Sequence, residues 1–425
     1  MGLGVAGTLV VTIALLAASG EDYGRYGEAR RALMFDGAAQ STQVILYSLG
    51  LFALAKRYVG APRLLAQVAA WLMFAGLAWL VMNMVWNLFR PAGAREAYKA
   101  VGLIQSLVLL AASILLTIAA DAWRRVPVAA AGLIVLQLTS YSFPVIGELI
   151  GKAIDGDVLI QRLYITTREV LTGLSLLFVA GALAAGGRAQ PENPAVAARG
   201  FRLAYGVLIA RVLAAIYMVL VGFAAVRSPE TAKLLALTGP LVLIGTQLVL
   251  AIAIAWISVT RVDGMPRFRI GIAAAGLFWY AMLQLEGLPE LVRGLWGGYD
   301  GRYGGELRPT DMFSVVGPIV SILSLALVGS AIISFASQRA NAQLGTAATS
   351  RTVGFVVVSL SAVALPSFVS AIRTPSSSLM LALMIGVGGV VALLLLTGLM
   401  RKASEAVEAL PGIPAARVVQ VNTRD

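Results

Sequence analysis

Twelve apolar runs of about 20 residues each limit what this chain of 425 residues can fold into more than any other feature. A helix of that length crosses the hydrocarbon core of a bilayer, which is about 30 Å thick. Hydrophobic residues make up 59% of the chain and charged residues 13%, and a water-soluble domain could not enclose so much apolar surface in one core. The sequence therefore predicts an all-α fold, a polytopic transmembrane helical bundle of about 12 helices. The runs are centred near Val10, Tyr47, Leu77, Leu110, Leu136, Leu176, Ala214, Leu248, Leu277, Leu325, Leu360 and Val390.

The first run could instead be a signal peptide, because the small residues Ala17, Ala18 and Ser19 would suit a signal peptidase. A signal peptide normally begins with a basic segment, and no Lys or Arg precedes this run. We therefore expect a retained membrane span and keep cleavage as the alternative.

The joins between the runs alternate in character. Arginine-rich joins occupy 56–63, 123–127, 187–202, 260–269 and 337–351, whereas the other joins are richer in acids and glycine. This alternation predicts six helical hairpins. The loops within the hairpins are alternately rich in acids and glycine and poor in them. This pattern predicts three tandem four-helix units, at 1–125, 126–265 and 266–402, followed by a short polar tail at 403–425 that is amphipathic or disordered.

Two similar loops support the repeat. EDYGRYGEARR at 21–31 and GYDGRYGGELR at 298–308 each follow the first apolar run of a predicted unit. AAAGL recurs at 129–133 and 273–277, early in the first run of the second and third units. The alternative is that biased composition alone makes apolar helices look alike.

The charges predict an orientation. Most of the 21 acidic residues lie on the hairpin-loop side, which leaves the arginine-rich joins as the more positive face. Following the positive-inside rule, we expect an inner-membrane protein with both termini in the cytoplasm. The net charge of +12 then favours contact with anionic lipids of the bilayer and not with nucleic acid, because no basic soluble surface exists to bind it.

Arg211 is the strongest candidate for a functional residue, because it lies near the middle of an apolar run. A charge at that depth faces a polar partner or a wet cavity. We expect Arg211 to face the protein interior, and among the acids we favour Glu286 as its partner.

Other polar residues near or within the apolar runs are candidates for a binding site or pathway. Their alternative roles are structural ion pairs, side chains that snorkel to the membrane surface, and hydrogen bonds between helices. The set is Glu148, Arg168, Glu169, Glu286, Glu290, Asn83 and Asn87. Single glutamines in the runs, such as Gln247, are expected to hold helices together. Pro144, Pro240 and Pro318 interrupt the apolar runs, where they could break a helix and line a site, although a tolerated kink is the more frequent outcome.

The sequence argues against an enzyme. Cysteine and histidine are absent, which removes thiol and imidazole nucleophiles and the usual soft metal ligands. No phosphate-binding glycine loop is present. We expect no catalytic residues, no metal and no cofactor.

Two kinds of function remain. A transporter or channel for a small solute or ion would use Arg211 and the acids, whereas a non-catalytic membrane subunit or scaffold would pack against partner proteins. GEDYGRYGEARR at 20–31 is loosely similar to a loop signature of the major facilitator superfamily. That superfamily places the loop after its second helix, has Asp where this chain has Gly24, and has six-plus-six symmetry. A major-facilitator-like secondary transporter is therefore the lesser alternative.

The predicted orientation is open to a labelling test, because the chain has no native cysteine. With a membrane-impermeant thiol reagent in intact cells, we expect Tyr26→Cys to be labelled and Gly264→Cys to be protected. Labelling of position 264 but not position 26 would invert the topology.

Overall fold

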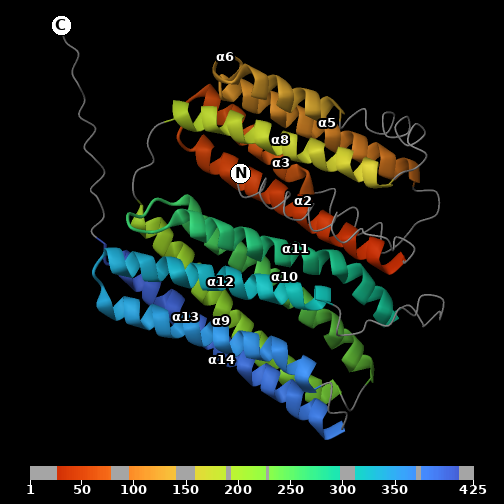
Figure 1. Ribbon diagram of the computed structural model, residues 1–425, viewed down its shortest axis with the longest axis vertical. Helices are drawn as coiled ribbons and strands as arrows, with labels where there is room; N and C mark the ends of the chain where they lie inside the picture. Colours follow the sequence, from red (N-terminus) through yellow and green to blue (C-terminus); the bar gives the residue numbers. More distant parts are fainter. Residues whose placement is uncertain are drawn as a thin grey trace. The chain divides into compact units, whose positions relative to one another are not determined.

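A computed structural model describes residues 26–77, 95–139, 158–187, 193–225, 229–296, 312–369 and 375–410. All regular secondary structure in these ranges is helical, and they contain no β-strand, as the sequence predicts (Figure 1). The helices are α2 Tyr26–Ala55, α3 Ala61–Ala75, α5 Arg95–Ala119, α6 Ala122–Arg125, the unlabelled helix Pro127–Thr139, α8 Val158–Gly186, α9 Pro194–Ala225, α10 Pro229–Val259, α11 Arg267–Trp296, α12 Met312–Gln338, α13 Ala342–Val369 and α14 Pro375–Glu408.

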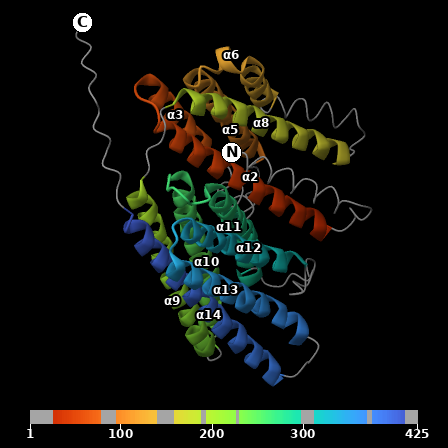
Figure 2. The same ribbon diagram turned by 60° about the vertical axis from the view of Figure 1, so that its left-hand side comes forward.

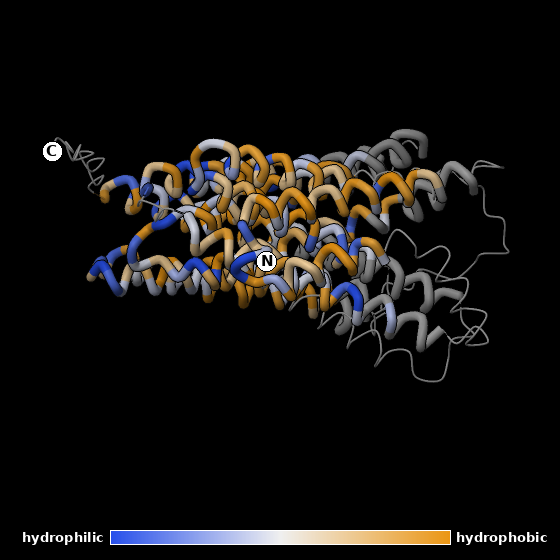
Figure 3. Tube along the Cα trace, turned by 90° about the horizontal axis from the view of Figure 1, so that it is seen from above, coloured by the Kyte–Doolittle hydropathy of each residue, from blue (hydrophilic) through white to orange (hydrophobic). Residues whose placement is uncertain are grey.

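Within the described ranges, nine helices are long and apolar enough to cross a membrane. Hydrophobic residues line the helix bodies, and hydrophilic residues gather toward helix ends (Figure 3). The protein is therefore an integral, multi-pass membrane protein. Eleven of the twelve apolar runs fall on these helices or at their ends, two of them on the shorter helices α3 and Pro127–Thr139. The run near Val10 lies outside the described residues.

The chain divides by its contacts into two units. Unit 1 comprises Met1–Ala189, Ser228–Ile244 and Ala275–Gly317, and unit 2 comprises Gln190–Arg227, Gly245–Ala274 and Pro318–Asp425. Within unit 1, α3 packs against both α2 and α5; within unit 2, α14 packs against both α9 and α13 (Figure 2). This division does not follow boundaries near 125 and 265, and the three-unit repeat stays a prediction.

Unit 1 is held together at its arginine-rich joins. The Tyr58 hydroxyl donates a hydrogen bond to the carbonyl of Leu183, and Arg125 Nη1 donates to the carbonyl of Ala182 at 3.3 Å. Leu183 lies in the last turn of α8, where carbonyls lack helical partners, and Ala182 directly precedes that turn. Burial raises the pKa of the Tyr58 phenol, an effect that the charge of Arg125 opposes, so the hydroxyl keeps its proton at neutral pH.

Hydrogen bonds also link the joins of unit 2. The backbone N–H of Asn193 donates to the carbonyl of Arg261 at 3.0 Å, and Arg339 Nη2 donates to the carbonyl of Asp263 at 3.2 Å. The joins that the sequence marks as arginine-rich therefore meet at one end of this unit. Gly264 has a φ of 83°, a conformation that disfavours cysteine, so the neighbouring exposed Asp263 is the better labelling position.

Two of these joins are shorter than the sequence suggested. Residues 194–202 belong to α9 and residues 342–351 belong to α13. Asparagine caps explain both early starts, because Asn193 Oδ1 accepts from the N–H of Val196 at 3.2 Å and Asn341 Oδ1 accepts from the N–H of Leu344 at 2.9 Å.

Of the two outcomes that the sequence allows for its prolines, a broken helix or a tolerated proline, the structure shows the second for Pro240 and Pro318. Pro240 lies inside α10 and Pro318 inside α12, and both helices continue through them. A proline removes one backbone hydrogen bond, and a membrane helix tolerates that loss where neighbouring groups compensate for it. The third such residue, Pro144, lies outside the described residues.

Close contact between α12 and α13 depends on Gly329. A methyl group at this position would lie 2.6 Å from Cγ2 and 3.0 Å from Cβ of Thr352. Threonine is stiff at χ1 and cannot swing away freely. The absence of a side chain at Gly329 therefore sets how closely these helices approach.

We expect Gly329→Ala to lower the free energy of unfolding in detergent by about 1–3 kcal/mol, because overpacking forces the two helices apart. Gly206→Ala is the matched control, since Gly206 has no atom within 4 Å of the new methyl group. The control should be neutral or stabilising by up to about 1 kcal/mol. Equal thermal stability of the two variants would contradict the close contact.

Candidate functional site

Arg211 lies on α9 within the candidate span Pro194–Tyr217. At 1.5 Å per residue, it is about 25 Å from the first residue of α9 and about 21 Å from the last. The position is therefore near the middle of the helix, far from either end. Its side chain is half-buried.

The guanidinium of Arg211 is hydrogen-bonded inside unit 2. Arg211 Nη1 donates to Gln247 Oε1 on α10 at 2.6 Å. Hydrogen bonds from a charged donor are shorter and stronger than neutral ones. The prediction that Arg211 has a polar partner is thus confirmed, although the sequence had not marked Gln247 as that partner.

Gln247 continues the contact to a third helix. Its side chain is fully buried, and its Nε2 donates to the hydroxyl of Ser321 on α12 at 3.4 Å, which is a long hydrogen bond. Ser321 is itself buried. The three side chains form the Arg211 network, which connects α9, α10 and α12 by side-chain hydrogen bonds alone.

The orientation of the Gln247 amide follows from its neighbours. Arginine offers only donors, so the amide oxygen has to face Arg211 and the amide nitrogen faces Ser321. Ser321 accepts this bond and keeps its own hydroxyl proton for donation. The Arg211 network therefore offers more hydrogen-bond donors than acceptors.

Arg168 and Glu169 form a separate ion pair in unit 1. Arg168 Nη2 lies 2.5 Å from Glu169 Oε1 on α8, and the side chains are 15% and 26% exposed. Adjacent residues of a helix normally point in different directions, so both side chains must bend to meet. The structure places both residues at the start of the candidate span Thr167–Gly186, as the sequence suggested.

The remaining candidates are not brought into a site by the described residues. Glu286 and Glu290 lie on α11, but their side chains are outside the described part of the structure. Glu148, Asn83 and Asn87 lie outside the described residues altogether. Glu286 as a partner of Arg211 therefore stays a prediction. The part of the chain that the structure describes holds no group of three acids that could bind a metal ion.

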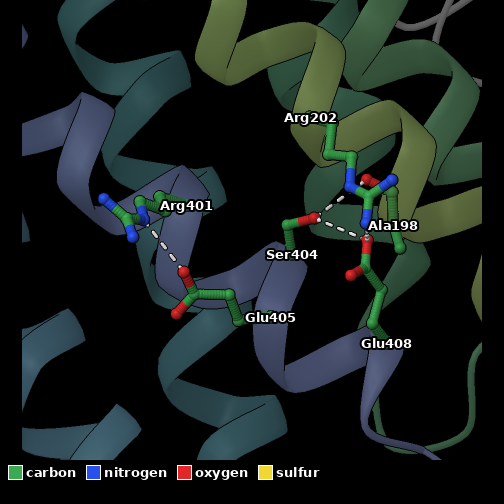
Figure 4. Close-up of polar contacts among 6 residues, drawn as sticks. All are labelled: Ala198, Arg202, Arg401, Ser404, Glu405 and Glu408. Atoms are coloured by element: carbon green, nitrogen blue, oxygen red, sulfur yellow. Dashed lines mark hydrogen bonds and ion pairs between the residues drawn. The ribbon is translucent and has the colours of Figure 1, made fainter.

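A second polar cluster fastens the end of α14 to α9 (Figure 4). Arg202 Nη2 lies 2.6 Å from Glu408 Oε1, and the Ser404 hydroxyl lies 3.2 Å from the carbonyl of Ala198 and 3.3 Å from Glu408 Oε1. Residues 403–408, which the sequence assigned to a tail, therefore continue α14 as an amphipathic turn against α9. This cluster lies at the helix ends and is structural.

No protein-family model, curated protein or solved structure matches this chain.

The Arg211 network predicts non-additive effects on stability. We expect Arg211→Ala and Gln247→Leu each to destabilise the protein in detergent, and the double variant to lose less than the sum. The reason is that each single change leaves a buried partner unsatisfied. Thermal unfolding of the four proteins should give a coupling of about 1–2 kcal/mol, and strictly additive losses would contradict the pairing.

Proposed function

We propose that this protein is a transporter or channel for a small solute or ion, with the Arg211 network as part of its pathway. The observation that carries the proposal is the hydrogen bond from Arg211 to Gln247 within apolar spans. A central charge is rare in membrane helices and usually faces the bundle interior or a water-filled cavity.

The composition of the network supports transport more than simple helix adhesion. Helix adhesion requires only a glutamine or serine, and arginine adds an insertion penalty of about 2.5–3.5 kcal/mol at the helix centre. An arginine retained at such a position is explained by a role that needs its charge.

The proposal includes the finer features that the sequence predicts. We place the protein in the inner cell membrane with both termini in the cytoplasm and the arginine-rich joins on the inner face. We also propose three ancestral four-helix units and a non-catalytic role. Superposition of 1–125, 126–265 and 266–402 in an experimental structure tests the repeat, which requires a shared helix order.

One observation favours the second candidate, a scaffold that packs against partner proteins. An open groove of about 230 Å³ lies beside the α12–α13 join and is lined mainly by small side chains. The lining residues are Ile333, Ala336, Ser337, Ala340, Asn341, Ala342, Gly345 and Thr349. Small residues of this kind allow another helix to approach closely.

Swelling of proteoliposomes distinguishes a transporter or channel from a scaffold, because only the former lets a solute enter. The same assay can screen a panel of solutes. Purified protein is reconstituted and diluted into iso-osmotic sodium chloride, potassium acetate, glycerol, amino acids or sugars. We expect the wild type to admit at least one of these solutes and Arg211→Ala to lose at least 90% of that rate when equal amounts of folded protein are reconstituted.

The matched control is Arg199→Ala, which removes an exposed arginine from the same helix and should keep the wild-type rate. Equal rates for Arg211→Ala and the control would remove Arg211 from the pathway. Absence of swelling in every solute, together with a stable partner protein that copurifies from native membranes, would favour the scaffold.

A further inference from the structure

Arg351 is a second arginine inside a candidate membrane span. It is the tenth residue of α13 and lies within the candidate span Ala342–Ala364. At 1.5 Å per residue, its Cα is about 13 Å from the first residue of the helix. The sequence placed it at the end of a polar join, so it was not singled out as a charge within the membrane.

The guanidinium of Arg351 occupies the space that a side chain at Gly398 of α14 would fill. A methyl group on Gly398 would collide with Nη1, and it would lie 2.8 Å from Cζ and 3.2 Å from Nη2. The glycine therefore forms a cradle for the guanidinium on the surface of α14.

At least one nitrogen of this guanidinium is unsatisfied by the described residues. Nη1 is enclosed and meets no hydrogen-bond acceptor in the part of the chain that the structure describes. The side chain as a whole is half-buried, so part of it remains accessible from outside the protein. Arginine stays charged, and a charge with unused donors in a membrane needs an acceptor.

The acids at this end of α14 are already engaged. Glu405 accepts from Arg401 Nε at 2.9 Å, and Glu408 pairs with Arg202 at 2.6 Å (Figure 4). The nearest turns of α14 thus provide no unengaged carboxylate for Arg351. Because the described residues give Nη1 no acceptor, we look to an acceptor outside this part of the chain for the outer edge of the guanidinium, Nε and Nη2.

The Cα of Arg351 lies below the headgroup region, but within one arginine side-chain length of it. With 28 residues, α13 is about 42 Å long, close to the 40–45 Å of a bilayer with its headgroups. Side chains of a helix tilt toward its N-terminus, so Arg351 reaches back from its Cα toward the α12–α13 join and the nearer membrane surface. Lipid phosphates lie at that level.

We infer that Arg351, held over Gly398, binds the phosphate of an anionic lipid in the leaflet at the arginine-rich end of unit 2. With Nη1 enclosed against Gly398, the Nε and Nη2 edge of the planar guanidinium is left for two parallel hydrogen bonds to a phosphate. The site is independent of the Arg211 network and of the transport proposal.

The test compares wild type, Arg351→Gln and the control Arg199→Gln, which removes an exposed arginine from α9. Each protein is equilibrated with mixed vesicles of phosphatidylglycerol and phosphatidylcholine, extracted in mild detergent and examined by native mass spectrometry. We expect wild type and control to retain phosphatidylglycerol preferentially, and Arg351→Gln to retain about tenfold less, as for the loss of a charged hydrogen bond.

Equal retention by Arg351→Gln and the control would overturn the inference, as would the absence of phosphatidylglycerol enrichment in the wild type.

A thermal-shift titration distinguishes a bound lipid from a soluble ligand. Phosphatidylglycerol should raise the Tm of the wild type and inorganic phosphate should not, and equal shifts would refute a lipid source. If Arg351→Gln fails to fold, Gly398→Ala should displace the guanidinium and lower retention. Unchanged retention in that variant would also refute the site.

Discussion

The cost of placing a guanidinium in a hydrocarbon layer is the constraint on which the polar features of this protein depend. Arginine cannot lower that cost by releasing its proton, so it has to find acceptors. Arg211, about 25 Å along α9, is too deep for headgroups to reach and is satisfied by protein groups, including Gln247. Arg351, about 13 Å along α13, is shallow enough for a lipid to supply the acceptor. Depth therefore separates the roles of two chemically identical side chains.

Small residues make these polar contacts possible. Lipid tails are as apolar as leucine, so helices in a membrane associate through close packing and hydrogen bonds rather than through the hydrophobic effect. Gly329 lets α12 approach Thr352 of α13, and Gly398 leaves space on α14 for the guanidinium of Arg351. The core of unit 1 is likewise rich in alanine, including Ala66, Ala70 and Ala112. The absence of a side chain thus makes room for a neighbouring helix at Gly329 and for a charged side chain at Gly398.

The sequence predicted the helical spans well because their length and composition are dictated by the bilayer. It also singled out Arg211, because a charge within an apolar run is conspicuous. It did not reveal Ser321, since serine fits apolar helices by bonding to its own backbone, as Ser324 does with the carbonyl of Val320 at 2.7 Å. Arg351 was missed because the cap at Asn341 starts α13 earlier than the polar sequence suggests. Contacts between residues far apart in the sequence, such as Gln247 with Ser321, cannot be predicted without knowing how the helices pack.

If the protein is a transporter or channel, the Arg211 network should lie along a hydrated pathway, and the accessibility of a cysteine at Ser321 reports on that hydration. The chain lacks native cysteine, so Ser321→Cys and Leu323→Cys each carry one thiol on α12. Leu323 is exposed on α12, and we expect it to face lipid. In native membranes, we expect a small water-soluble thiosulfonate to modify position 321 and to spare position 323. Protection of position 321 in the membrane, with full reaction after denaturation, would contradict a hydrated pathway at the Arg211 network.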